Sequence, residues 1–127
     1  MTDTTTQATI LVIDDNVDSL DMIGHIFRHH HIDFDVTSSA EEALELLAQR
    51  TYKGLVVDLA LPKMDGWTLL NQVHQNPDTA DLKCVAVTAY HSAELAVKAI
   101  DAGFIAFFPK PLQNSAFARE IQRILES

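Results

Sequence analysis

The fold of this chain is decided by the stretch Leu55-Val56-Val57-Asp58-Leu59-Ala60-Leu61-Pro62-Lys63-Met64-Asp65-Gly66. An apolar run bounded by turn residues predicts a strand buried on both faces, as parallel sheets require. Asp58 would then lie at the carboxyl edge of the sheet, where open α/β folds bind ligands, although such an aspartate also commonly caps the following helix. Pro62 is expected to stiffen the departing loop, and Gly66 to permit a turn before the next helix.

Composition limits the class of protein. A chain of 127 residues, with 47% apolar and 21% charged residues, is sufficient for one soluble domain. The net charge of -9 argues against direct nucleic-acid binding, which needs clustered lysine and arginine. The lone Cys84 is expected in the core, in a reduced, cytoplasmic compartment. No apolar stretch is long enough for a membrane span, and residues 1–8 read as a flexible lead to a domain at 9–127.

The rest of the sequence alternates between strand and helix patterns. Strands are expected at 9–13, 34–36, 55–58, 82–88 and 104–108. Helices are expected at 17–30, from the capping box Ser39–Glu42 through Leu47, at 65–75, at 92–102 and at 114–126. Gly103 suits the left-handed turn after the fourth helix.

Strict alternation of strand and helix predicts a parallel sheet with right-handed crossovers and helices on both faces. The expected architecture is an α/β fold: a flavodoxin-like, three-layer α/β/α sandwich of five βα units with strand order 2-1-3-4-5. That order places the first and third strands side by side, at the topological switch point.

Polar residues follow four of these strands, and this order brings them to one edge of the sheet. They are Asp14, Asp15, Asp58, Thr88 and Lys110. Clustered carboxylates repel one another unless a cation intervenes, and their hard oxygens suit Mg²⁺ that keeps several waters. An aspartate is also a competent nucleophile toward phosphorus. Asp58, alone on the central strand, is the natural acceptor, and Asp14 and Asp15 would hold the ion.

With these residues in place, the chain resembles a response-regulator receiver domain of two-component signalling over about residues 9–125. The matching residues are the pair Asp14-Asp15, Asp58 with Pro62 four and Gly66 eight positions later, Thr88-Ala89 and Lys110-Pro111. The resemblance implies a phosphoacceptor rather than an enzyme, with only self-phosphotransfer and autodephosphorylation.

The resemblance also implies a role for each site residue. Asp58 would take a phosphoryl group from a sensor histidine kinase or phosphotransfer protein, with the backbone carbonyl of Ala60 as a further Mg²⁺ ligand. Thr88 and the Ala89 amide would hydrogen-bond the phosphoryl oxygens, and Lys110 would pair with one of them. The bond before Pro111 would be cis.

A switch is implied as well. Added negative charge would pull Thr88 inward, and the aromatic Phe107 would turn into the space that Thr88 leaves. The surface formed by the fourth helix, fifth strand and fifth helix would then repack and bind a downstream protein. Ile105-Ala106 stands where DNA-binding relatives that dimerise through this face usually have an acidic residue, so that dimer is not expected.

Other features have simpler interpretations. Ala60 cannot position an attacking water and Tyr90 could shield the site, so the phosphorylated form should hydrolyse at a moderate rate. The rings of His29-His30-His31 splay apart on a helix and are not expected to share one ion, whereas His25 and His74 are expected on helix surfaces. His91 is a candidate partner contact. Asp65, like Asp18, is expected at a helix start.

The residues at these positions bear on three alternative functions. A flavodoxin-type phosphate site would want small residues and amide donors where Asp14-Asp15 stands. A phosphatase of the haloacid dehalogenase type needs a second acid at position 60, which is Ala60. A docking module of the same fold that works without phosphorylation remains the alternative, and the chain is expected to act either alone or as part of a larger regulator.

Overall fold

The computed structural model describes residues 9–61, 63–90, 92–112 and 114–126. Pro62 and His91, for which a loop role and a partner contact were expected, lie outside the described residues. Five strands alternate with five helices: β1 (Ile10–Ile13), α1 (Val17–His29), β2 (Phe34–Thr37), α2 (Ala40–Gln49), β3 (Gly54–Asp58), α3 (Gly66–Gln75), β4 (Lys83–Thr88), α4 (Ala93–Ala102), β5 (Ala106–Pro109) and α5 (Asn114–Glu126).

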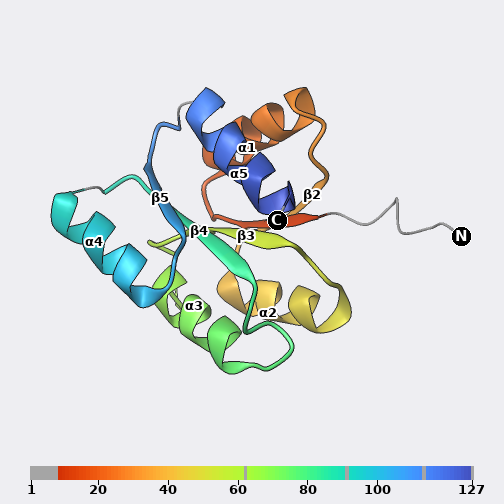
Figure 1. The fold of residues 1–127 in the computed structure, drawn as a ribbon, viewed down its shortest axis with the longest axis vertical. Helices are drawn as coiled ribbons and strands as arrows, with labels where there is room; N and C mark the ends of the chain where they lie inside the picture. The colour runs from red at the N-terminus through yellow and green to blue at the C-terminus, as the bar shows by residue number, and fades with distance from the viewer. Residues whose placement is uncertain (1–8, 62, 91, 113, 127) are drawn as a thin grey trace, which may run out of the picture.

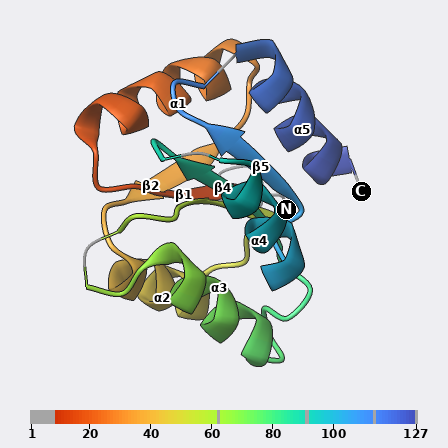
Figure 2. The ribbon, with the colours of Figure 1, turned by 90° about the vertical axis from the view of Figure 1, so that its left-hand side faces the viewer.

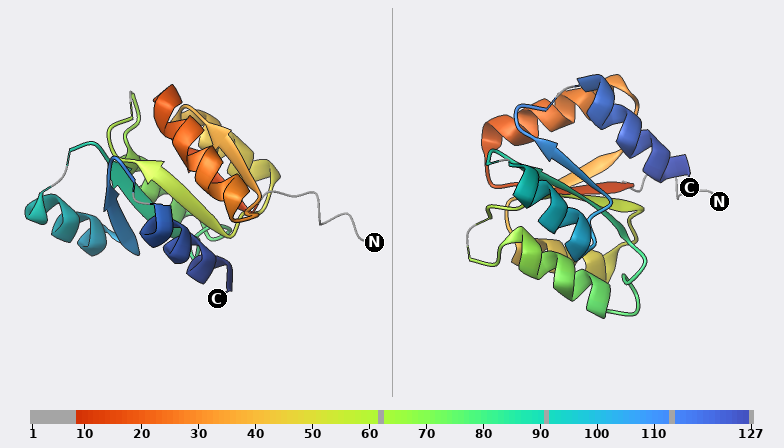
Figure 3. Two further views of the ribbon diagram at one scale, coloured as in Figure 1. Left: turned by 90° about the horizontal axis from the view of Figure 1, so that it is seen from above. Right: turned by 60° about the vertical axis from the view of Figure 1, so that its left-hand side comes forward.

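The strands form one parallel sheet in the order β2-β1-β3-β4-β5, which confirms the predicted topology. The helices cover both faces (Figure 1), with α1 and α5 on one side and α2 and α3 on the other. Figures 2 and 3 show the same layers from other directions. The three-layer α/β/α architecture expected from strict alternation is therefore present.

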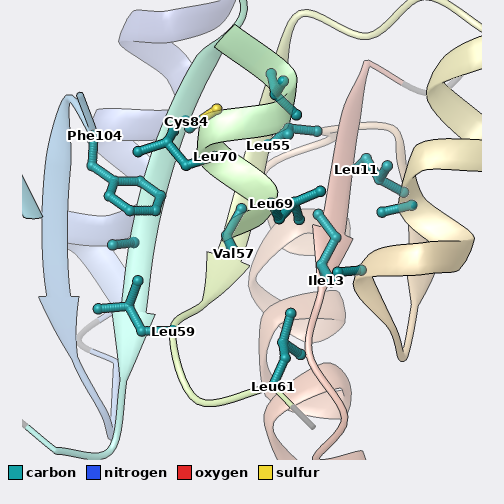
Figure 4. Close-up of a cluster of buried hydrophobic side chains, with 14 of the residues drawn as sticks. Leu11, Ile13, Leu55, Val57, Leu59, Leu61, Leu69, Leu70, Cys84 and Phe104 are labelled. Atoms are coloured by element: carbon teal, nitrogen blue, oxygen red, sulfur yellow. The ribbon is translucent and has the colours of Figure 1, made fainter. Parts of the chain in front are cut away.

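Each face of the sheet has its own apolar core, because side chains alternate between the faces along every strand. On the α2–α3 side, Leu55 and Cys84 of the strands lie near Leu70 of α3, and Leu11 of β1 belongs to the same buried cluster (Figure 4). On the other side the sheet packs against α1 and α5, where Phe27 and Phe117 stack with ring centroids 5.7 Å apart. Burial on both faces explains why the central strands read as continuous apolar runs.

The helices begin where the sequence places side-chain caps. Asn16, Ser39, Asp65 and Ser92 each accept a hydrogen bond from a backbone N–H in the first turn of their helix. The expectation that Asp65 starts a helix is confirmed by its 2.9 Å bond from the Thr68 amide. Gly103 follows α4 with a φ of 123°, in the positive-φ region expected for it.

One local expectation needs correction, and one glycine has a specific role. The fifth strand begins at Ala106 rather than Phe104, because the Phe104 amide donates to the Ala99 carbonyl of α4 at 3.1 Å. The Phe104 ring is buried in the α2–α3 core and packs edge-on against Trp67, with ring centroids 5.9 Å apart. Gly66 begins α3, and a positive φ in the loop before it is held by Lys63, at 60°, rather than by this glycine. Instead, a Cβ at Gly66 would lie 2.7 Å from the Asp58 carbonyl oxygen, so glycine is needed for close approach.

Candidate functional site

Strand register brings the polar strand ends together at one edge of the sheet. Ile13 pairs with Val57, and Asp58 pairs with Val87, so Asp14 follows β1 level with Asp58. Thr88 pairs with Pro109, which places Lys110 directly after the end of β5. The five residues expected to converge from the order of the strands are therefore neighbours for a structural reason: the strands are parallel and end together.

Asp58 closes the central strand and is almost entirely buried, with 5% of its surface exposed. Its Oδ1 accepts a hydrogen bond of 3.0 Å from the Ala60 amide, and its Oδ2 lies 3.3 Å from Lys110 Nζ. The backbone beyond it is tied to β4, because the Leu59 amide donates to the Val87 carbonyl at 3.0 Å. One carboxylate oxygen is thus fixed by the loop, and the other faces the lysine.

Asp14 is fully buried beside it. Its Oδ1 accepts the Asn16 amide at 2.9 Å, and its Oδ2 lies 2.7 Å from Lys110 Nζ. Within the described residues this Oδ2 has no hydrogen-bond partner of regular geometry, so the ion pair with Lys110 is its contact with the protein. Burial raises the pKa of Asp14 above its ordinary value of 3.8, more than Lys110 and Asn16 lower it.

Asp15 is exposed and completes a group of three carboxylates. Asp14, Asp15 and Asp58 each offer an oxygen, and these oxygens lie within 4.8 Å of one another. One member is open to solvent while the other two are buried, so a bound ion could keep water on its exposed side. An all-oxygen set of this kind fits Mg²⁺, and the under-bonded Asp14 Oδ2 supports that fit.

Thr88 and Lys110 form the other wall of the site. The Thr88 hydroxyl is buried and accepts the Tyr90 amide at 3.1 Å, while its carbonyl accepts the Lys110 amide at 2.8 Å. Ala89 and Tyr90 are exposed. The Lys110–Pro111 peptide bond is cis, the isomer that the resemblance implies.

Phe107 lies on β5, two residues before Pro109, the strand partner of Thr88, and packs half-buried against the core on the α2–α3 side. Of the histidines, His25 is exposed as expected, but His74 is half-buried. A Cβ added at Gly103 would come within 2.9 Å of the His74 imidazole. The carbonyl of Ala60 is not among the contacts described, so its metal role stays a prediction.

Two supporting residues were missed from the sequence. Asn16 caps α1 and also donates its amide to Asp14, so a single turn joins the helix start to the carboxylate. Thr37, at the end of β2, accepts the Asp14 amide through its carbonyl at 3.1 Å, and its hydroxyl donates to Glu42. An asparagine directly before a helical pattern is a capping signal and could have identified the first.

Comparison with known proteins agrees with this geometry. The model of the response regulator receiver domain family matches residues 10–122. An uncharacterized 14.6 kDa protein of Leptolyngbya boryana, from the sodA1 3′ region, is 34% identical over 94% of this chain and 92% of its own length. The crystal structure of a CheY-like response regulator receiver domain protein from Methanospirillum hungatei superposes with a TM-score of 0.82, at 26% identity and 95% coverage of both chains. The chain therefore belongs to the response-regulator receiver domain family, part of two-component signalling.

Relatives of this family differ in how much of their length the chain matches. The signal transduction histidine-protein kinase BarA of Escherichia coli is 28% identical over 84% of this chain, which spans 12% of that protein. The activities of such larger proteins are therefore not carried over to this chain. Among the residues that the structure describes, no helix is long and apolar enough to cross a membrane.

Proposed function

We propose that Asp58 is the phosphoacceptor of a two-component phosphorelay. The observation that carries this proposal is the group formed by one nearly buried aspartate at the central strand end, two further carboxylates within 4.8 Å and a lysine within 3.3 Å. Membership of the receiver family supplies the class of reaction, and the donor would be the phosphohistidine of a kinase or phosphotransfer protein.

The transfer forms one bond to phosphorus and breaks another. An Asp58 carboxylate oxygen attacks phosphorus, the phosphorus–nitrogen bond of the donor breaks, and the donor imidazole leaves with the bonding electron pair. Lys110 lies beside the carboxylate, so its ammonium could pair with a phosphoryl oxygen as negative charge is transferred. The product is an acyl phosphate on Asp58.

Asp14, Asp15 and Asp58, with the Ala60 carbonyl as a further ligand, are the residues that would hold Mg²⁺. When bound, the ion would neutralise charge on the transferring group. The Thr88 hydroxyl accepts the Tyr90 amide and so keeps its own hydrogen to donate to a phosphoryl oxygen, which, with a bond from the Ala89 amide, is its proposed role. These roles rest on family membership together with the positions of the residues around Asp58.

The consequence of phosphorylation would be a change at the surface formed by α4, β5 and α5. Thr88 and Phe107 are the proposed switch residues. Phe107 already packs against the core next to α4, so a movement of its ring would change the packing of α4 against the sheet. This surface would bind a downstream protein, and hydrolysis of the acyl phosphate at a moderate rate would end the signal.

The test is phosphorylation by acetyl phosphate, with and without Mg²⁺, followed by intact mass measurement. We expect a gain of one phosphoryl group in the wild type with Mg²⁺, and none in Asp58→Asn. Asp78→Asn is the matched control, because Asp78 is an exposed aspartate in the α3–β4 connection, at the opposite edge of the sheet, and should not change the result.

Two outcomes would contradict the proposal. Equal mass gain in Asp58→Asn would place the acceptor elsewhere. The absence of any gain, with Mg²⁺ and in every variant, would favour a docking module of the same fold that works without phosphorylation.

A further inference from the structure

Helix α1 carries a pair of histidines on its outer face that the acidic site does not use. His25 and His29 are four residues apart within Val17–His29, so they lie one above the other on one side of the helix. Both are exposed. Four residues nearly complete one helical turn, so the angle of about 100° that separates adjacent helical residues does not divide this pair.

The two imidazoles border a shared hollow. A cavity of about 220 Å³ is lined by His25, Ile26, His29 and His30. Ile26 is 2% exposed and packs into the core between the sheet and α5, so it fixes this part of the helix. The His30 ring stands nearly perpendicular to that of His29, with centroids 5.1 Å apart. The pair is therefore presented on a rigid element, beside open space.

The local charge favours a cation at this place. His29 is in the last turn of α1, where the backbone carbonyls give the helix end partial negative charge. The neighbouring Arg28 is turned to another side of the helix, where its guanidinium lies 6.0 Å from the centre of the Phe34 ring. Asp21 precedes His25 by one turn and adds a carboxylate on the same side.

We propose that His25 and His29 form a binding site for a divalent transition-metal ion, of the class of Zn²⁺, Ni²⁺ and Cu²⁺, completed by water. Neutral imidazole is the ligand that these borderline ions prefer, whereas Mg²⁺ prefers oxygen. Two histidines at this spacing on one helical face are a known arrangement for zinc. The site differs in metal class from the carboxylate group around Asp58.

The site has two protein ligands rather than three or more. In the described ranges, Asp14, Asp15 and Asp58 are the one group of at least three potential ligands whose atoms lie within 4.8 Å of one another. His30 therefore borders the hollow without completing a three-ligand cluster. An open, two-ligand site is expected to exchange its ion readily and to bind less tightly than a closed structural zinc site.

The test is a calorimetric titration with Zn²⁺ of protein that carries no polyhistidine tag, in excess Mg²⁺ to occupy the carboxylate group. We expect one equivalent to bind the wild type, and His25→Gln/His29→Gln to weaken the affinity by about tenfold or more. The control is His31→Gln, which removes an exposed imidazole beside the same helix end that does not line the hollow, and it should weaken binding by less than about threefold. Cu²⁺ bound to the wild type should show nitrogen hyperfine coupling in its paramagnetic resonance spectrum, and that coupling should be lost in the first variant.

Three results would contradict the assignment of the ion to His25 and His29. Absence of Zn²⁺ binding by the wild type, or equal affinity in His25→Gln/His29→Gln, overturns the proposal. Loss of binding in the control variant instead would assign the ion to the adjacent histidines. The variant Asp58→Asn should bind Zn²⁺ with unchanged affinity, so this inference stands or fails separately from the phosphoacceptor role.

Discussion

Lys110 Nζ lies 2.7 Å from Asp14 Oδ2 and 3.3 Å from Asp58 Oδ2, so the lysine is held more closely by the buried neighbour than by the proposed acceptor. One ammonium thus faces two buried carboxylates, and a third, that of Asp15, is nearby in solvent. The site is short of positive charge, and this shortage is the physical basis for expecting a cation to bind there.

Replacing Lys110 should lower the stability of the protein. We expect Lys110→Met to lower the free energy of unfolding by about 1–3 kcal/mol in metal-free buffer, because two buried carboxylates lose their shared partner. Mg²⁺ should recover part of the loss by binding the same oxygens. Urea unfolding with and without Mg²⁺ measures both effects. Lys63→Met, at an exposed loop position, is the control and should change stability by less than about 0.5 kcal/mol.

Asp14→Asn should raise stability at neutral pH in the absence of metal. Burial raises the pKa of Asp14 in the folded state above 3.8, so the folded protein holds this proton more tightly than the unfolded chain. The contribution of the group to stability is therefore lost as pH rises from about 4 through the folded-state pKa. Asparagine does not ionise, and Lys110 keeps Asp58 as a partner.

Urea unfolding at pH 4 and pH 7 tests this. The stabilisation by Asp14→Asn should be larger at pH 7 than at pH 4. Mg²⁺ should reduce the difference in unfolding free energy between variant and wild type, because it stabilises the wild type more. A variant less stable than the wild type at pH 7 would mean that the Lys110 ion pair outweighs the burial of the charge.

Much of the fold was predictable because it depends on local patterns. Continuous apolar runs indicated strands covered on both faces, and the Ser39, Asp65 and Ser92 caps marked helix starts within a residue. The convergence of Asp14, Asp58 and Lys110 followed from strand order alone, since parallel strands end at a common edge.

What could not be predicted depends on distances between segments. The preference of Lys110 for Asp14 over Asp58 is a matter of tenths of an ångström and of burial that no motif encodes. Phe104 belongs to an apolar run that predicts a strand, but its amide donates to the Ala99 carbonyl at the end of α4.

Gly66→Ala should disturb the site through the backbone. A Cβ there would lie 2.7 Å from the Asp58 carbonyl oxygen and 2.9 Å from Leu59 Cα, neither of which is a flexible side-chain end. We expect a loss of about 1–3 kcal/mol in unfolding free energy and slower phosphorylation, because the acceptor strand must shift.

The matched control is Gly24→Ala, also at a buried glycine. Its Cβ would meet the end of the Arg28 side chain at 3.2 Å, which can move, and the Phe34 ring at 3.3 Å. Alanine favours helix by up to about 1 kcal/mol over glycine, so this variant should lose little or gain. Equal losses in the two variants, by urea unfolding, would show that the clash at Asp58 is not decisive.

The protein should lose stability in alkali through Cys84. Burial raises the pKa of this thiol to about 12, from an ordinary value of 9.0, so the folded state keeps a proton that the unfolded chain releases. The free energy of unfolding should therefore fall as pH rises above 9, by about 2 kcal/mol at pH 10.5. The native thiol should also resist alkylation at pH 8 and react once urea unfolds the chain.

Cys84→Ala separates this effect from general alkaline denaturation. The variant should be less stable than the wild type at pH 8, because it leaves a cavity among Leu55, Leu70 and Phe104, yet its stability should fall less steeply up to pH 10.5. Tyr52→Phe is a useful comparison, since burial and the hydrogen bond to Asp35 raise the pKa of Tyr52 to about 12 from 10.0. The ordinary pKa of Tyr52 is higher than that of Cys84. Tyr52→Phe should therefore reduce the loss of unfolding free energy at pH 10.5 by less than about 1 kcal/mol. If the unfolding free energies of wild type and Cys84→Ala fall equally between pH 8 and pH 10.5, the pKa of the thiol is the same in the folded and unfolded states, and the prediction is wrong.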